Sequence, residues 1–326
     1  MEELLLYTAR ITRNLLRQLP DGEYQFTDFL DDDGLGHGPI PISVTLKIQD
    51  DQAIVDFRQS APQQKGSINA VFAITLSAVN YVFRCLLGID VPNNAGCLEP
   101  VQVIVAQNSV VNAAFPAAVA GGNVETSQRI VDVLLGAMAQ IPASASRLPV
   151  PAASQGTMNN LTIGGYDPFR QRPFAYYETI AGGMGARFNS PGPSAMHSHM
   201  TNTLNTPVEA LEYTYPLRAI RYAIRSGSGG QGAFRGGDGI CRDIQVLADC
   251  EITLISERRK FAPYGLKDAQ PGKPGKNILI RSGKEIELPG KGTFELQAGD
   301  LISICTPGGG GYGLANAPLG GTESSS

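Results

Sequence analysis

The glycines of this 326-residue chain lie in clusters, and these clusters constrain its fold more than any other feature. There are 38 glycines, and the main clusters are Gly121-Gly122, Gly182-Gly183, Gly227–Gly230, Gly236-Gly237 and Gly308–Gly311. Glycine has no Cβ atom, so such clusters are typical of tight turns and of places where two backbones approach closely. Apolar runs between the clusters argue against a disordered, low-complexity chain. The sequence therefore predicts a folded protein with many turns and close backbone contacts.

Helical and strand-like patterns alternate before residue 141. Residues 2–19 predict an amphipathic helix that must pack on something, with an apolar stripe of Leu5, Ile11, Leu15, Leu16 and Leu19. Apolar alternation over 40–49 predicts a half-buried strand, paired with 52–57 across an Asp50-Asp51 turn. A further strand is expected at 23–30, and helices at 70–87 and 123–140 are apolar enough to lie in the core.

Beyond residue 152 the pattern changes to short strands separated by Gly or Pro turns. We expect strands at 161–163, 174–179, 218–225, 243–247, 252–256, 277–281, 285–288, 293–296 and 301–305. This spacing is typical of an antiparallel barrel or sandwich. A Pro/Ser/Ala-rich stretch at 141–152 predicts a linker. The predicted fold class is α+β, with a helix-containing domain at 1–140, a β-rich domain at 153–313 and a flexible tail at 314–326.

Charge and composition exclude several classes of protein. There are 26 basic and 30 acidic residues, so the chain has no basic excess with which to bind nucleic acid. The longest apolar run, near 68–87, is interrupted by polar residues and is not expected to span a membrane. The N-terminus shows no leader pattern, and the five cysteines are scattered without a CxxC pair. We therefore expect a cytoplasmic protein with reduced thiols and neither nucleic-acid nor membrane partners.

The segment from His197 to Thr203 is the densest in candidate functional side chains, and it holds two of the three histidines. In an extended segment, residues two apart point to the same side, so His197 and His199 would face a substrate together, followed by Thr201. Two histidines do not complete a metal site, because a third ligand is needed. The alternative is a hydrogen-bonded loop with satisfied histidines. We interpret the segment as a substrate-facing strand.

Two segments near predicted helix or strand ends carry amide and carboxylate groups. Asn123 and Glu125 follow Gly121-Gly122 at a helix start, where free backbone N–H groups would face an anion. An ordinary capped helix is the favoured interpretation of that segment taken alone. Asn160 ends a stretch of amide and hydroxyl side chains beside a predicted strand.

Charged residues mark three further candidates. Glu178 is a plausible general base if burial raises its pKa, and the alternative is a buried, paired carboxylate. Arg258, in the run 256–260, would bind a carboxylate or phosphate, unless the run is a salt-bridged surface turn. The acidic run Asp31–Asp33 is interpreted as a solvated turn rather than a Ca²⁺ loop, because no twelve-residue loop with a terminal Glu follows.

Taken in order along the chain, these segments resemble those of hydantoinase B/oxoprolinase subunits. The matching blocks span about residues 2–313 and read NAGCLEP, GGNVETSQ, ASQGTMNN, YYETIAGGMGAR, HSHMTNTLNTPVEALE, GSGGQGAFRGGDG, SERRK and TPGGGGYG. Because many independent blocks agree in identity and order, the resemblance is specific. The stretch 205–209 is more similar to separate bacterial hydantoinase B subunits than to fused single-chain 5-oxoprolinases.

The resemblance implies ATP-dependent opening of a cyclic amide such as hydantoin, N-methylhydantoin or 5-oxoproline, and acetone carboxylase is a relative. ATP and Mg would be bound by a companion A-type subunit in a hetero-oligomer. We expect Glu178, His199 and His197 to be catalytic. The substrate is expected to contact Thr201, Asn202, Asn160, Asn123, Glu125 and Arg258.

The chain departs from the family pattern at its start. Family members begin with a long N-terminal region that includes a His/Asp-rich motif, whereas this chain starts in what would be the middle. We therefore expect a split subunit, a truncation or a fragment, and no complete metal site within it. A divalent metal would be completed by the missing N-terminal region, which is an expected partner. The alternative is a non-catalytic assembly subunit that docks through the apolar face of residues 1–19.

Overall fold

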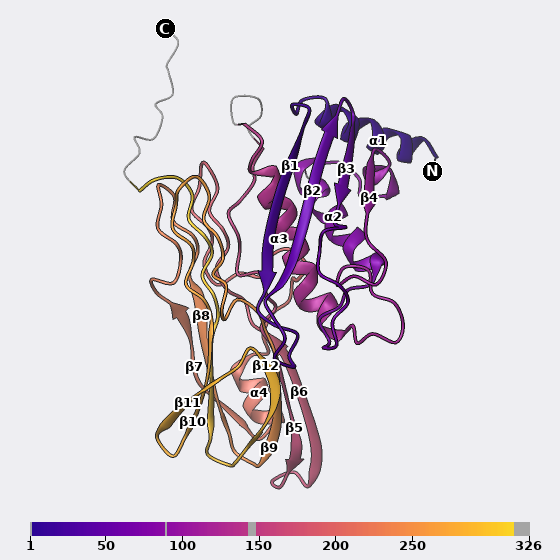
Figure 1. Ribbon diagram of the computed structural model, residues 1–326. Coiled ribbons are helices and arrows are strands. Elements are labelled where there is room, and N and C mark those ends of the chain that lie inside the picture. The colour runs from indigo at the N-terminus through magenta and orange to yellow at the C-terminus, as the bar shows by residue number, and fades with distance from the viewer. Residues whose placement is uncertain (1, 89, 143–147, 316–326) are drawn as a thin grey trace.

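The computed structural model describes residues 2–88, 90–142 and 148–315, which form two halves joined along one long axis (Figure 1). Each half has its own hydrophobic core, one drawn from residues between 16 and 150 and the other from residues between 161 and 304. Of the four α-helices in these ranges, three lie in the first half, and most strands lie in the second. The predicted α+β class is therefore confirmed, while the domain bounds stay a prediction. Residues 143–147 of the predicted linker and 316–326 of the predicted tail lie outside the described residues.

A four-stranded sheet forms the base of the first half. Its strands lie in the order β1 (Gly22–Leu30), β2 (Ile40–Gln49), β3 (Gln52–Asp56) and β4 (Val101–Ile104), all antiparallel except the parallel pair β3–β4. Alternate residues of β2 are buried, from Ile40 to Ile48, which confirms the strand predicted at 40–49. Asp50, with a φ of 54°, lies in the turn of the predicted hairpin to β3.

Two helices pack on this sheet. Helix α3 (Ser127–Met138) continues a π-helical turn, η2 (Gly122–Thr126), and lies against β1 and β2, while α2 (Phe72–Leu86) packs on α3. Every residue of α3 is buried, as predicted for a core helix. Helix α2 differs from its prediction, because it buries only one face and leaves Phe72 and Leu76 more than a third exposed.

The first helix, α1 (Glu2–Leu16), forms as predicted, but of the predicted stripe only Leu16 and Leu19 are buried. Its buried residues are Thr8, Ala9, Thr12 and Leu16, whereas Leu5 of the predicted stripe is 41% exposed. The helix packs on the short 3-10 helix η1 (Ala95–Leu98). The Thr12 hydroxyl donates to the Cys97 carbonyl at 3.0 Å, and the Thr8 hydroxyl donates to Asn94 at 2.6 Å. Hydrogen bonding by small side chains therefore selects the packed face near the start of the helix, and Leu4, Leu5 and Leu6 are left outside.

Two antiparallel sheets form the second half and pack face to face as a sandwich. One sheet has the order β12 (Lys291–Leu296), β9 (Cys250–Ile255), β5 (Asn160–Asp167), β6 (Arg172–Thr179). The other has the order β11 (Lys284–Leu288), β10 (Lys276–Arg281), β13 (Leu301–Cys305), β8 (Gly239–Val246), β7 (Leu217–Arg225). A short helix, α4 (Val208–Thr214), packs beside β7 and was not predicted. Of the two predicted alternatives, sandwich and barrel, the sandwich is the one that forms.

The glycine clusters other than Gly121-Gly122 meet in a bundle of extended segments beyond one end of the sandwich (Figure 1). The segment 306–313 exchanges backbone hydrogen bonds with four neighbours, which are the segments 152–153, 183–186, 230–237 and 266–273. A strand in a sheet has only two hydrogen-bonded neighbours, so this packing is not a sheet. We call these five segments the glycine bundle. The prediction of close backbone approaches is confirmed.

Backbone atoms surround the glycines of this bundle. A Cβ atom built on Gly309 would lie 2.0 Å from the Met184 carbonyl oxygen, and one on Gly236 would lie 2.0 Å from the Gly309 carbonyl oxygen. Neither glycine has a positive φ. Glycine is required here by the space between backbones, not by the backbone conformation.

The cysteines differ from their prediction in one respect. The register of β8 and β13 places Cys241 directly opposite Cys305, with their Cα atoms 4.2 Å apart, and a disulfide joins them. The other three, Cys85, Cys97 and Cys250, are free. The expectation of five reduced thiols is therefore wrong for this pair, which removes one argument for a cytoplasmic location. The pairing depends on contacts between strands 64 residues apart, which the cysteine spacing does not reveal.

No helix in the described part of the chain is long and apolar enough to cross a membrane.

Candidate functional site

A cavity of about 310 Å³ lies where the two halves meet, and it brings together several of the predicted site residues. Its wall is formed by residues of η2, of the end of β6 and of the loop before α4: Asn123, Val124, Met158, Tyr177, Glu178, Thr179, Met200, Thr201, Thr203, Leu204 and Thr206. Asn123, Glu178 and Thr201 were predicted as site residues. A volume of this size suits a small organic molecule.

Glu178 lies on β6 and is fixed on all sides. One of its carboxylate oxygens accepts hydrogen bonds from Tyr176 and Asn205, both at 2.8 Å. Arg242, from the facing sheet, donates to both oxygens at 3.2 and 3.3 Å. The pair is almost fully buried and links the two sheets of the sandwich. The geometry is that of the alternative interpretation, a buried and paired carboxylate, at the wall of the cavity.

Asn160 and Glu125 lie directly behind the cavity wall. The Asn160 amide nitrogen donates to Glu125 at 2.8 Å, and the Tyr177 hydroxyl donates to the Asn160 oxygen at 2.7 Å. Burial raises the pKa of Glu125 to about 8, against hydrogen bonds from Thr157 and Met158 that lower it. Glu125 is thus a neutral carboxylic acid over most of the physiological pH range. These two residues reach the cavity through Tyr177 and do not line it.

The two histidines do not form the predicted strand. His199 has a φ of 56°, which turns the chain and ends the alternation on which a shared face depends. Its Nε2 atom lies 3.3 Å from an Asp132 carboxylate oxygen on α3, and its Nδ1 atom lies 3.5 Å from the Tyr81 hydroxyl on α2. His197 is half-buried, burial lowers its pKa, and its ring nitrogens have no hydrogen-bond partner among the described residues. The predicted strand is therefore wrong, while Thr201, further along, does line the cavity.

Arg258 belongs to a buried network instead of the cavity wall. Its guanidinium lies 2.7 Å from Asp132 and 2.8 Å from Asp28, and Arg129 lies 2.8 Å from the same oxygen of Asp28. We call Asp28, Arg129, Asp132 and Arg258 the buried charge network. It joins β1 and α3 to the loop after β9, which means that it holds the two halves together. Asn202, the last predicted contact residue, is exposed and does not line the cavity.

The acidic run at 31–33 also joins the halves. The Asp31 carboxylate accepts hydrogen bonds from the backbone N–H groups of Arg259, Lys260 and Phe261 at 2.7 to 3.1 Å. Asp31 and Asp33 are buried. The interpretation of this run as a solvated turn is wrong, because its partners lie more than 220 residues away and are not visible from local sequence.

Gly121-Gly122 packs on the backbone rather than presenting N–H groups to an anion. The N–H of Gly121 donates to Ser67, and the N–H of Gly122 donates to Val119. A Cβ atom on Gly122 would lie 1.9 Å from the Asn69 carbonyl oxygen. These glycines therefore bring η2 close to the segment before α2.

Within the described residues no group of three or more His, Cys, Asp or Glu side chains is placed to hold a metal ion. These residues alone do not build the metal site that the family resemblance implies.

Tyr177 and Thr179, which flank Glu178, line the cavity without having been predicted. They lie on the opposite face of β6 from Glu178, because successive side chains of a strand alternate between its two faces. The register of β5 and β6 would have found them, since it sets Asn160 opposite Thr179.

Comparison with known proteins identifies relatives along almost the whole chain. Residues 1–315 match the profile of the family described as Hydantoinase B/oxoprolinase. A 5-oxoprolinase of Dictyostelium discoideum is 39% identical over 316 residues, which are 97% of this chain and 23% of the relative. A putative D-/L-hydantoinase B-type subunit of a Pseudomonas species is 29% identical over 330 residues, which are 96% of this chain and 54% of the relative.

The fold also matches a solved structure. The crystal structure of an ATP-dependent caprolactamase from Pseudomonas jessenii superposes with a TM-score of 0.83 at 26% identity, covering 96% of this chain and 55% of that chain. The chain thus spans less than a quarter of the 5-oxoprolinase and about half of the other two proteins. The family match confirms the resemblance carried by the sequence blocks, and the chain belongs to the hydantoinase B/oxoprolinase family.

Proposed function

We propose that this chain is the C-terminal part of the B-type subunit of an ATP-dependent cyclic-amide hydrolase, and that the cavity beside β6 binds the amide. The observation that carries the proposal is the cavity itself. It gathers Asn123, Glu178 and Thr201 from three distant parts of the chain. Three relatives, a 5-oxoprolinase, a hydantoinase subunit and a caprolactamase, are named after cyclic amides.

The lining suits a small, neutral ligand rich in hydrogen-bonding groups. Four threonines, Asn123 and Tyr177 offer hydroxyl and amide groups, while Met158, Val124 and Leu204 offer apolar surface that excludes water. Glu178, held by Arg242, contributes a fixed negative charge. ATP and Mg, bound by an A-type subunit, would supply the free energy for ring opening. The residues of this chain bind and orient the ring.

A cavity-blocking variant tests this function. Thr201→Phe places an aromatic ring in the cavity, and we expect ATP-dependent hydrolysis of hydantoin or 5-oxoproline to fall by about a hundredfold or more, because misplacement by about 1 Å already has an effect of that size. The chain is co-expressed with an A-type subunit and with the portion of the B-type subunit that it does not span. Ring-opened product and ADP are measured together.

Ala210→Phe is the matched control, since Ala210 is exposed on α4 and does not line the cavity. It should keep both activity and melting temperature. Full turnover in Thr201→Phe would place the reacting amide elsewhere.

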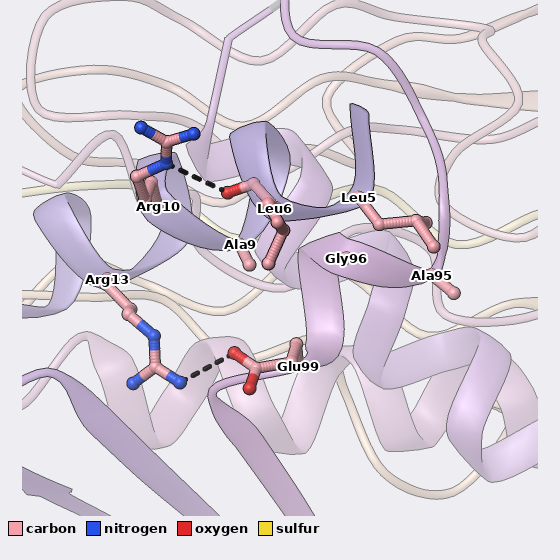
Figure 2. A pocket seen from close by; sticks show the side chains of 8 residues that line it. All are labelled: Leu5, Leu6, Ala9, Arg10, Arg13, Ala95, Gly96 and Glu99. Carbon is pink, nitrogen blue, oxygen red and sulfur yellow. Dashed lines mark hydrogen bonds and ion pairs between the residues drawn. The ribbon is translucent and has the colours of Figure 1, made fainter. Parts of the chain in front are cut away.

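We also propose that the apolar surface around α1 docks the portion of the B-type subunit that this chain does not span. Two hollows of about 550 and 510 Å³ border η1 and share Ala95. Figure 2 shows Leu5 and Leu6 of α1 over Ala95 and Gly96, with the Arg13–Glu99 ion pair at one end. This chain covers about half of the related hydantoinase subunit, and the portion that it does not span is the occupant that we propose for this surface. A purely structural assembly subunit would use the same surface.

A charge placed on this surface tests the docking. Leu6 is 55% exposed, so Leu6→Glu should leave the fold intact while abolishing co-purification with the tagged remainder of the subunit, because a carboxylate would be buried without a partner. Asn14→Glu, on the exposed polar side of the same helix, should co-purify as the wild type does. Equal recovery of both variants would rule out α1 as the docking element.

A further inference from the structure

We propose that Tyr177 and Thr179 recognise the cis amide edge of the bound ring, with Tyr177 accepting a hydrogen bond from the ring N–H and Thr179 donating one to the ring carbonyl. The inference rests on the proposed function, since it takes the cavity beside β6 as the substrate site. The inference names the arrangement of hydrogen-bonding groups that a ligand of this cavity must carry. Neither the family match nor the predicted residues supply that arrangement.

The orientation of the Asn160 side chain determines whether Tyr177 donates or accepts a hydrogen bond in the cavity. Its Nδ2 group donates to the Ile255 backbone carbonyl at 2.7 Å and to Glu125 at 2.8 Å. A backbone carbonyl can only accept, so the NH₂ end of the Asn160 amide must face Ile255. The Asn160 oxygen therefore faces the other way, toward Tyr177. This orientation holds whether Glu125 is protonated or not.

The orientation of Asn160 fixes the role of Tyr177. A phenol has one hydrogen, and the Tyr177 hydroxyl donates it to the Asn160 oxygen at 2.7 Å. The hydroxyl oxygen is then left with lone pairs only, so it can accept but not donate. Tyr177 lines the cavity and is 56% exposed, whereas Asn160 and Glu125 behind it are buried. A rigid, buried support thus presents an acceptor to the ligand, and the ligand must supply an N–H or O–H group.

Thr179 offers the complementary group on the same face of the strand. Thr179 lines the cavity, and its hydroxyl is buried and has no hydrogen-bond partner among the described residues. A buried donor without a partner is costly and is satisfied by a ligand carbonyl. The register pairs Thr179 with Asn160, to which Tyr177 bonds diagonally, so the Tyr177 hydroxyl is directed toward Thr179.

An acceptor beside a donor matches a cyclic amide and not an open-chain one. In a lactam or hydantoin ring the amide is cis, so its N–H and C=O lie on one edge. An open-chain secondary amide is trans and presents these groups on opposite sides. Tyr177 and Thr179 together therefore select cis amides that carry an N–H.

Ligand-observed NMR titration of the full chain tests this with three probes, δ-valerolactam, its N-methyl derivative and open-chain N-methylacetamide. The wild type should bind δ-valerolactam roughly two- to tenfold more tightly than either other amide, which is the range for one neutral hydrogen bond. Tyr177→Phe should bring the ratio of δ-valerolactam to its N-methyl derivative close to one. Thr179→Val should weaken both lactams by the same factor. Tyr166→Phe, at the far end of β5, should keep the wild-type ratio.

The outcomes separate the inference from the function on which it rests. Suppose that Thr201→Phe abolishes binding but Tyr177→Phe leaves the ratio of the δ-valerolactam affinity to that of its N-methyl derivative unchanged. That result would overturn the role of Tyr177 and keep the cavity as the site. If none of the three amides binds saturably to the wild type, the proposed function and this inference are both overturned. The melting temperature of each variant, expected within a few degrees of the wild type because Tyr177 is half exposed, confirms that the variants are folded.

Discussion

Gly309→Ala should prevent the second half of the chain from folding stably. The added methyl group would lie 2.0 Å from the Met184 carbonyl oxygen and 2.2 Å from the Met184 carbonyl carbon. Both are backbone atoms held by hydrogen bonds of the glycine bundle, so no side chain can move aside. Overpacking of a well-packed interior costs about 1–3 kcal/mol when side chains can adjust, and we expect at least the upper end here. Thermal unfolding followed by circular dichroism should show a melting temperature lower by about 5 °C or more, or no soluble protein.

Gly164→Ala is the matched control for this prediction. Gly164 lies within β5, and the nearest atom to an added Cβ would be the Phe174 carbonyl oxygen at 3.7 Å, an ordinary contact. The free energy of unfolding of this variant should lie within about 0.5 kcal/mol of the wild-type value. If Gly309→Ala and Gly164→Ala have the same melting temperature, the close backbone packing of the glycine bundle is not needed for stability.

Arg258→Met should lower the free energy of unfolding by about 3–5 kcal/mol, which is the usual effect of removing one partner of a buried ion pair. The methionine keeps much of the side-chain volume but leaves Asp132 without its closest cation and Asp28 with Arg129 alone. Burial alone would raise the pKa of Asp28, and Arg258 and Arg129 overcome it and hold this pKa at about 2. Chemical unfolding at neutral pH measures the loss.

The same variant should also be more sensitive to acid. A carboxyl whose pKa is lowered in the folded state stabilises the fold above its unfolded pKa of about 4, and this stabilisation is lost as pH falls through the folded value. In the wild type the contribution of Asp28 is therefore lost between about pH 4 and pH 2. Without Arg258 the folded pKa rises, and the midpoint of acid unfolding should move to higher pH.

Two comparisons separate the contribution of the buried charge network to stability from the effect of removing any charged side chain. Arg58→Met removes an exposed ion pair with Asp56 and should leave the free energy of unfolding close to that of the wild type, because solvent screens such a pair. Arg258→Met combined with Asp132→Asn should lose less than the sum of the single variants, because the unpaired carboxylate is then gone. Strict additivity would mean that Arg258 and Asp132 do not act as a pair.

Local patterns in the sequence were sufficient for most strands and core helices. Alternation over 40–49 and the turn at Asp50 predicted the β2–β3 hairpin, because both signals lie within a dozen residues. The short strands after residue 152 followed from apolar runs between turn residues in the same way. Helix α4 was missed, since seven residues hold too few apolar positions to define a helical period.

Features that depend on distant partners could not be predicted. Apolar content indicated that α3 is buried, but nothing near Arg129 or Asp132 points to Asp28 and Arg258, which lie more than 100 residues away. The strand expected at His197 failed because a single residue, His199, adopts a left-handed conformation there. Of the predicted site, Asn123, Glu178 and Thr201 line one cavity, whereas Arg258 and His199 contact Asp132 instead and His197 does not line the cavity.

The position of the Gly308–Gly311 segment in the chain has a consequence for biosynthesis. A ribosome releases this protein from its N-terminus, and the first half, whose core uses residues between 16 and 150, can gather its hydrophobic contacts while the rest is still being made. The four other segments of the glycine bundle emerge before the one that they all surround. They lack their backbone hydrogen bonds to 306–313 until residue 313 has left the ribosome. The second half therefore completes its folding only after residue 313 has been translated, and a premature stop before this residue would leave the glycine bundle incomplete.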